Sequence, residues 1–132
     1  MNLSKCIPTH KGDLAAAHQA EMAGFPVLND IIGDLLPWVK DPTWPVAEKL
    51  VPLLINADME IAPHLMAIFA SHDEDWKMAL LVTIAPKLKP GIQKLLAPTL
   101  DRMATTPTDT EAAATIDEAA KLVRAAWSAQ DP

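Results

Sequence analysis

The segment His72-Asp73-Glu74-Asp75 concentrates more potential metal ligands than any other part of the sequence. Imidazole and carboxylate groups bind zinc, and carboxylates bind calcium, so a metal site is the first chemistry that this segment suggests. The four histidines, however, include no pair four residues apart with an acid between them, as a helical zinc site has. We therefore interpret the segment as a capped, solvated turn and predict no metal ligands and no cofactor.

The nucleophilic side chains lack the sequence context that covalent catalysis requires. Ser4, Ser71 and Ser128 stand in no nucleophile-elbow motif, and Cys6 has no recognisable His or Asn partner. With only four glycines, the chain also contains no phosphate-binding glycine loop. The sequence therefore gives no catalytic residue and favours a protein that is not an enzyme, although a site assembled from distant residues stays open.

Tryptophan and charged residues recur together at two turns, where they form the candidate binding site. Its residues are Trp38, Asp41, Trp44, Asp73, Trp76 and Lys77. Tryptophan beside charge is typical of interface anchors, so one interpretation is a ledge that contacts a partner. The other is structural: the indoles pack between helix pairs, while the aspartates accept hydrogen bonds from backbone N–H groups or from Lys77. We favour the structural role for Asp41 and Asp73 and for the packing of Trp44 and Trp76, and leave Trp38 open.

The charge balance argues against nucleic acid as a partner. The chain carries a formal charge of −6 and no run of basic residues, whereas nucleic-acid binders neutralise phosphates with a basic face. We expect no binding to duplex DNA or RNA at physiological ionic strength in a fluorescence-anisotropy titration. Micromolar binding that weakens steeply with added salt would contradict this prediction.

Composition sets the class of protein and the expected compartment. Half of the residues are hydrophobic, which excludes disorder driven by low hydrophobicity, and the single cysteine, Cys6, cannot form an internal disulfide. The longest apolar run, residues 78–86, is too short to cross a bilayer, and the start of the chain lacks the apolar region of a signal peptide. We therefore expect a soluble, cytoplasmic protein with no membrane contact.

Hydrophobic residues at spacings of three and four predict about seven helices and no strand. The expected helices cover residues 14–23, 27–40, 44–57, 61–70, 76–88, 90–104 and 109–127. The expected N-caps are Asp13, Thr43, Asp75 and Thr108, the last in a capping box with Glu111. Pro37 and Pro98 should kink their helices. Residues 78–85 are apolar nearly all round, so we place that helix at the centre of the fold. Trp127, on the last expected helix, we interpret as a core or end-cap residue.

The sequence also matches itself at a step of 32 residues. This shift superposes Asp41 on Asp73, Trp44 on Trp76, and the two expected caps on each other. A period in the thirties with two helices per unit is typical of an α-solenoid, an α-α superhelix of stacked antiparallel pairs. We predict one domain over residues 1–132, with a capping segment at 1–26 and repeats at about 27–58, 59–90 and 91–128.

The order of helices, with prolines in the first helix of a pair, is similar to HEAT/ARM-like repeats. More narrowly, the chain resembles an uncharacterised bacterial family of small HEAT-like proteins, a family of unknown function. The matching segments are IPTHKGD (7–13), LPWVKD (36–41), WPVA (44–47), DEDWK (73–77), LDRM (100–103) and Pro107-Thr108. Thr43 stands where that family tends to have Asn, and Pro37 where it tends to have an acid. The resemblance implies the fold and no activity.

Two functions follow as hypotheses from these observations. The first is a non-catalytic scaffold that binds a protein or peptide along its stacked helices. The alternative is a small-molecule binder or an enzyme that uses the Trp/Asp ledge at the repeated turns. A deep pocket lined by Trp38, Trp44 and Trp76 would favour the alternative, whereas an open ridge would favour the scaffold. The sequence identifies neither a specific partner nor an oligomeric state.

Overall fold

The computed structural model describes residues 3–130, which form helices and no strand. In chain order the elements are η1 (Leu3–Cys6), α1 (Leu14–Ala23), η2 (Val27–Ile31), α2 (Ile32–Leu35), η3 (Leu36–Val39), α3 (Pro45–Ile55), α4 (Ile61–Phe69), α5 (Glu74–Thr83), η4 (Ala85–Lys87), α6 (Pro90–Thr105), α7 (Asp109–Ala113) and α8 (Ile116–Gln130), where η denotes a 3-10 helix. The predicted all-helical class is confirmed. The described residues contain eight α-helices rather than about seven, because the last expected helix is divided into α7 and α8.

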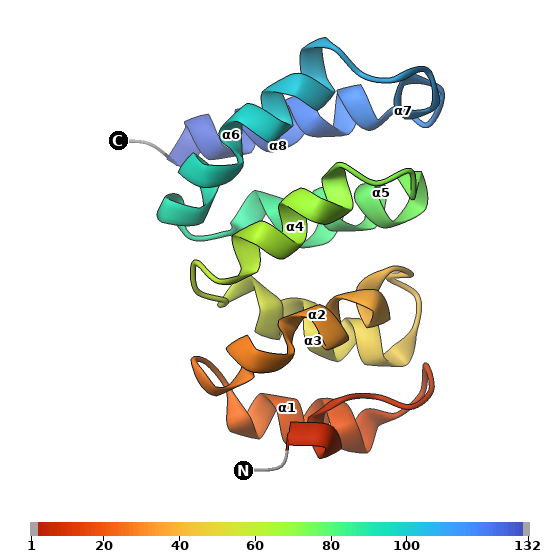
Figure 1. The fold of residues 1–132 in the computed structure, drawn as a ribbon, viewed down its shortest axis with the longest axis vertical. Helices are drawn as coiled ribbons and strands as arrows, with labels where there is room; N and C mark the ends of the chain where they lie inside the picture. The colour runs from red at the N-terminus through yellow and green to blue at the C-terminus, as the bar shows by residue number, and fades with distance from the viewer. Residues whose placement is uncertain (1–2, 131–132) are drawn as a thin grey trace.

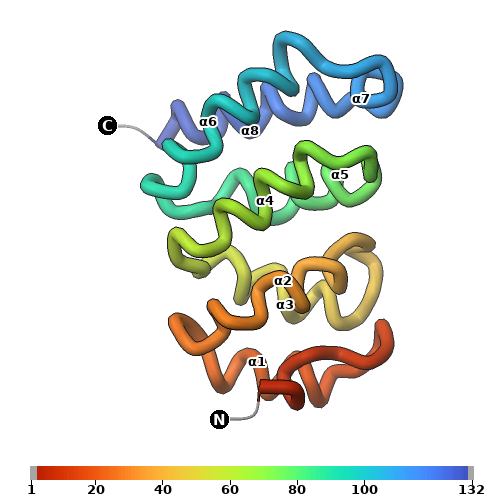
Figure 2. Tube along the Cα trace, in the orientation of Figure 1, coloured from red at the N-terminus to blue at the C-terminus, as the bar shows by residue number. Residues whose placement is uncertain are grey.

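The helices lie in layers that follow one another in chain order, so that the two ends of the chain lie at opposite ends of the molecule (Figure 1). In each layer two segments contact each other: η3 with α3, α4 with α5, and α6 with α8. Between layers, α2 contacts α4 and α4 contacts α6, while α5 contacts both η3 and α8 (Figure 2). Helix α1 packs on α3 and covers the first layer.

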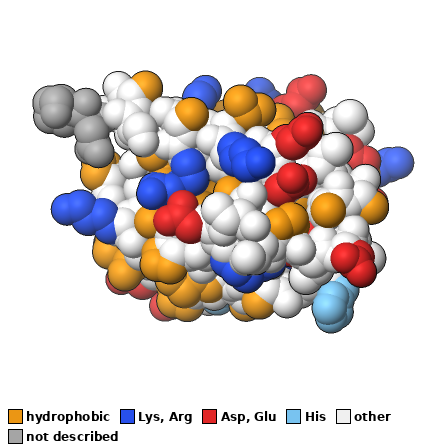
Figure 3. All heavy atoms as spheres, turned by 90° about the horizontal axis from the view of Figure 1, so that it is seen from above, with side chains coloured by type: hydrophobic (Ala, Val, Ile, Leu, Met, Phe, Trp, Pro, Cys, Tyr) orange, Lys and Arg blue, Asp and Glu red, His pale blue; other side chains and the backbone are white. Residues whose placement is uncertain are grey.

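The buried side chains form one hydrophobic cluster that runs through all layers. The longer α-helices contribute buried residues at helical spacing, such as Leu50 and Leu54 on α3 or Leu96 and Leu100 on α6. At the C-terminal end of the stack, the outer face carries acidic and basic side chains among hydrophobic ones (Figure 3). Charged side chains on the outer face of a terminal layer make that face compatible with water.

The expected helix over residues 27–40 is correct in its buried stripe and wrong in its regularity. Leu28, Ile32, Leu35 and Val39 are fully buried, as the spacing predicts. The backbone, however, passes through η2, a single α-turn in α2, and η3. Pro37 lies in the first turn of η3, where it has no N–H to donate and where its ring blocks continuation of an α-helix.

Two other helices differ from their predicted bounds. Helix α5 ends at Thr83 rather than near residue 88, and the chain continues as η4 around Pro86. The last helix is divided: α7 ends at Ala113, and Thr115 takes a left-handed φ of 59° before α8 begins at Ile116. By contrast α6 runs without a break through Pro98.

The predicted stop of α1 at Gly24 is confirmed, with a positive φ of 62° at that glycine.

The predicted capping box at the start of α7 is present. The Thr108 hydroxyl accepts a hydrogen bond from the Glu111 N–H at 3.2 Å, and the Glu111 carboxylate accepts one from the Thr108 N–H at 2.9 Å. We expect Thr108→Ala to lower the free energy of unfolding by about 0.5–2 kcal/mol, the usual effect of losing an N-cap hydroxyl. A urea denaturation series measures this change. An unchanged midpoint would mean that the hydroxyl contributes nothing to stability.

Candidate functional site

The turn between η3 and α3 places the first group of candidate residues. Asp41 organises this turn, because its Oδ1 accepts hydrogen bonds from the Thr43 N–H at 2.9 Å and the Thr43 hydroxyl at 2.7 Å. These bonds hold the pKa of Asp41 below its ordinary value and keep the carboxylate ionised. The predicted N-cap role of Thr43 is therefore wrong: its hydroxyl donates to Asp41, and Trp44 occupies the N-cap position with no side-chain cap.

The equivalent turn before α5 is capped by Asp73. Its Oδ1 accepts a hydrogen bond from the Trp76 N–H at 3.1 Å, one of the free donors at the start of α5. The prediction that Asp75 caps this helix is wrong, because Asp75 lies inside the first helical turn, where its side chain cannot reach back to cap. Both Asp41 and Asp73 are half-buried and accept backbone hydrogen bonds, as we predicted, but they do so in different local geometries.

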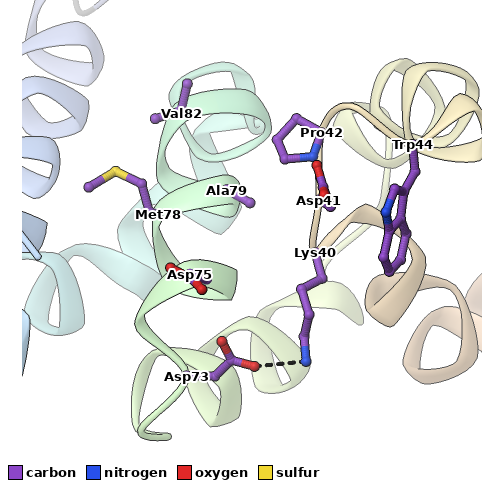
Figure 4. A pocket seen from close by; sticks show the side chains of 9 residues that line it. All are labelled: Lys40, Asp41, Pro42, Trp44, Asp73, Asp75, Met78, Ala79 and Val82. Carbon is purple, nitrogen blue, oxygen red and sulfur yellow. Dashed lines mark ion pairs between the residues drawn. The ribbon is translucent and has the colours of Figure 1, made fainter.

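Lys40 links the two turns. Its ammonium lies 2.8 Å from Asp73 Oδ2 (Figure 4). It also lies 5.1 Å from the centre of the Trp76 ring, so it contacts a carboxylate and an aromatic face together. The hydrogen bond from Lys40 is the main cause that lowers the pKa of Asp73, with a smaller contribution from the Trp76 N–H. The expected alternative partner of Asp73, Lys77, points elsewhere.

Lys77 belongs to a buried ion network. Its ammonium lies 2.7 Å from Glu74 Oε1 and 3.0 Å from Glu111 Oε2, and its side chain is 3% exposed. Arg102 donates two hydrogen bonds to the same Glu111 carboxylate, at 2.6 and 2.8 Å. These contacts tie α5, α6 and α7 together. They also hold the pKa of Glu111 far below its ordinary value, chiefly through Arg102 and further through Thr108 and Lys77.

The tryptophans of the candidate site are half-buried and pack against one another or against Lys40. The Trp38 and Trp44 ring centres lie 6.1 Å apart at an interplanar angle of 56°, a tilted aromatic pair. The Trp76 indole nitrogen is buried and, among the described residues, has no hydrogen-bond acceptor. Trp127 is separate from this group: it is 3% exposed and donates to the Ala85 carbonyl at 2.8 Å.

An open groove, which we call the α5 groove, lies between the 40–44 turn and α5 and has a volume of about 690 Å³. Its lining residues are Lys40, Asp41, Pro42, Trp44, Asp73, Asp75, Met78, Ala79 and Val82. Figure 4 shows Ala79 on the side of α5 that faces Asp41 and Pro42, with Met78 and Val82 on the far side. Val82 is 64% exposed and the side chains of Lys40, Pro42 and Asp75 are also exposed, so the groove is an open surface rather than an enclosed cavity.

The structure brings half of the candidate residues to this groove. Asp41, Trp44 and Asp73 line it, while Trp38 lies against Trp44, Trp76 lies beneath Lys40, and Lys77 is buried in the ion network.

Sequence analysis missed Lys40, Pro42, Asp75, Met78 and Val82 as groove residues. We described residues 78–85 as apolar nearly all round and placed their helix at the centre, whereas Val82 on this helix is exposed. Lys40 carried a detectable signal, because it directly precedes Asp41 in the first of the repeated turns.

Two other classes of site have no candidate among residues 3–130. Within this range no three His, Cys, Asp or Glu side chains are arranged so that they could hold a metal ion. None of the described helices combines the length and the hydropathy needed to cross a bilayer.

The Asp73 cap allows the structural role of the repeated turns to be tested. We expect Asp73→Ala to lower the free energy of unfolding by about 1 kcal/mol, because it removes the acceptor of the Trp76 N–H and the partner of Lys40. The neighbouring Asp75 is exposed, and its side chain has no hydrogen-bond partner among the described residues. Asp75→Ala should therefore change the free energy of unfolding by no more than about 0.5 kcal/mol. Thermal melts compare the two. A melt of Asp73→Ala that matches the parent would assign Asp41 and Asp73 to binding rather than to stability.

These features define an all-helical protein with an open groove at the turns between its layers. The chain belongs to the family described as Domain of unknown function (DUF5071), whose sequence profile it matches over residues 6–123. No curated protein matches the chain. The expected membership in a family of unknown function is therefore confirmed at this level.

Proposed function

We propose that this protein is a HEAT/ARM-like α-solenoid scaffold that binds a segment of another protein in the α5 groove. The support for the solenoid is the order of contacts, because each layer packs on the next along the chain. Scaffolds of this type use the surface that the stacked helices create, and the α5 groove lies at the junction of two layers.

The observation that carries the proposal is the exposure of apolar side chains along this groove. Val82 is 64% exposed on α5, and Met78, Pro42 and Trp44 contribute further apolar side chains to the lining of the groove. Exposed apolar side chains beside a partly exposed tryptophan are typical of protein interfaces, because an incoming side chain can displace water from them.

The alternative, a small-molecule or catalytic site on the Trp/Asp ledge, has less support. It requires a deep pocket lined by Trp38, Trp44 and Trp76. Of these three, only Trp44 lines the α5 groove, and the volume of about 690 Å³ lies between exposed walls. A peptide suits such a groove better than a small ligand, whose surface a pocket buries almost completely.

Site-specific photo-crosslinking in the source organism tests the proposal. A photoreactive amino acid at position 82 should give a discrete crosslinked product. The matched control is the same amino acid at Met22, which is 70% exposed on α1 and lies outside the groove. Equal products from both positions, or none from position 82, would contradict the proposal.

A further inference from the structure

We propose that the occupant of the α5 groove is an extended peptide with one apolar side chain and one Lys or Arg about three positions apart. This inference rests on the proposed function and specifies its partner. It follows from the distribution of apolar and charged side chains along the groove.

One end of the groove is apolar. Val82 lies near the C-terminal end of α5 and Met78 in the middle of this helix, while Pro42 and Trp44 lie on the opposite turn (Figure 4). Apart from the Trp44 indole N–H, these side chains carry no group that requires a hydrogen bond. This end therefore suits a leucine-like or aromatic side chain.

The other end is acidic. Asp73 and Asp75 line the groove at the start of α5, and both also line an adjoining hollow of about 540 Å³ formed by residues 71–75. With Asp41, three carboxylates border the groove against one ammonium, that of Lys40, which Asp73 already binds. Asp75 is exposed and has no ion-pair partner among the described residues, so it is available to a cation on a ligand. Charge complementarity therefore favours a basic side chain at this end.

The spacing between the two ends sets the spacing on the peptide. Asp75 and Val82 are seven residues apart on α5, which corresponds to about 10 Å at a rise of about 1.5 Å per residue. An extended peptide advances about 3.3 Å per residue. Its basic and apolar side chains should therefore stand about three positions apart.

Selection of a displayed library of random nine-residue peptides against the intact protein tests this inference. We expect the enriched peptides to share Lys or Arg about three positions from a large apolar residue. Binding of the best synthetic peptide, measured by fluorescence polarisation, should weaken at least about tenfold in Asp75→Lys because like charges then meet. Glu21→Lys makes the same charge change at an exposed site on α1, outside the groove, and should leave binding nearly unchanged. Val82→Asp should abolish binding.

The outcomes separate the two levels of the proposal. Enriched peptides that depend on Val82 but lack a basic residue, or that bind Asp75→Lys normally, would overturn the partner chemistry alone. A selection in which no peptide depends on Val82 would overturn the proposed function as well. Circular dichroism of each variant shows that the helical fold is retained, so that a loss of binding is assigned to the groove.

Discussion

Glu111→Gln is expected to lower the free energy of unfolding by about 3 kcal/mol, the lower end of the range for breaking a buried ion pair. The carboxylate is fully buried and contacts both Lys77 and Arg102. Glutamine retains the shape but removes the negative charge, so the ammonium of Lys77 remains buried with Glu74 as its only carboxylate partner. We expect a loss at the lower end of that range because Glu74 still pairs with Lys77 and because Arg102 is partly solvated. Urea denaturation of the two proteins measures the difference.

The same network makes a prediction about pH. The pKa of Glu111 in the folded protein lies well below its ordinary value of 4.5. A group whose pKa is depressed by folding stabilises the folded state above its unfolded pKa and loses that contribution as the pH falls through the folded pKa. The stability difference between wild type and Glu111→Gln should therefore be constant near neutral pH and decrease below about pH 4.5. An equal difference at pH 7 and pH 3 would show that charge is not the cause.

Two further variants separate charge from packing. Lys77→Met in the Glu111→Gln background removes the buried cation, so it should recover part of the lost stability. Glu118→Gln, an exposed acid on α8, should change the free energy of unfolding by no more than about 0.5 kcal/mol. If the double variant is less stable than Glu111→Gln, the cation is not the source of the loss.

Trp127→Ala is expected to lower the free energy of unfolding by about 3–5 kcal/mol, the usual range for deleting a large buried side chain. Trp127 is almost fully buried, and its indole N–H donates to the Ala85 carbonyl in η4. Deletion leaves a cavity between α8 and η4 and removes the shorter of the two hydrogen bonds that this carbonyl accepts. Because α8 belongs to the last layer, we expect its amides to lose hydrogen-exchange protection first.

Trp127→Phe is the matched variant, since it keeps an aromatic ring and removes the N–H group. Trp127→Phe should lower the free energy of unfolding by less than Trp127→Ala does. Most of its effect should come from the lost indole hydrogen bond, which leaves the Ala85 carbonyl with only the longer bond from the Leu88 N–H at 3.4 Å. If alanine and phenylalanine variants are equally stable, the ring does not contribute packing energy at the end of the stack.

Local sequence signals predicted much of the fold because they act over a few residues. The capping box at Thr108, the stop at Gly24 and the buried stripe of residues 28–39 are all present. The signals failed where the backbone could satisfy a helical stripe in more than one way. The stripe around Pro37 is compatible with 3-10 turns as well as with an α-helix, and Thr115 breaks the last helix without a glycine or proline to mark the position.

The candidate site was less predictable, because it depends on which layers face one another. Asp41 and Asp73 were identified by their repeated position, but the partner of Asp73 is Lys40 from the preceding layer rather than Lys77 from the same helix. A spacing of four residues brings Lys77 and Asp73 to neighbouring turns, yet burial against Glu111 outweighs that proximity. Likewise, an apolar run cannot indicate that Val82 faces solvent, since exposure is set by the packing of α5 against η3 and α8.

The most direct test of the α5 groove as a binding surface is an NMR titration with the best peptide from the library. Each of the four tryptophans has one indole N–H, and only Trp44 lines the groove, whereas Trp127 is buried at the end of the stack. We predict that the Trp44 indole signal and the amides of Asp75 and Val82 shift on titration while the Trp127 signal does not. A shift of Trp127 with Trp44 unchanged would contradict the proposal that this groove binds the partner.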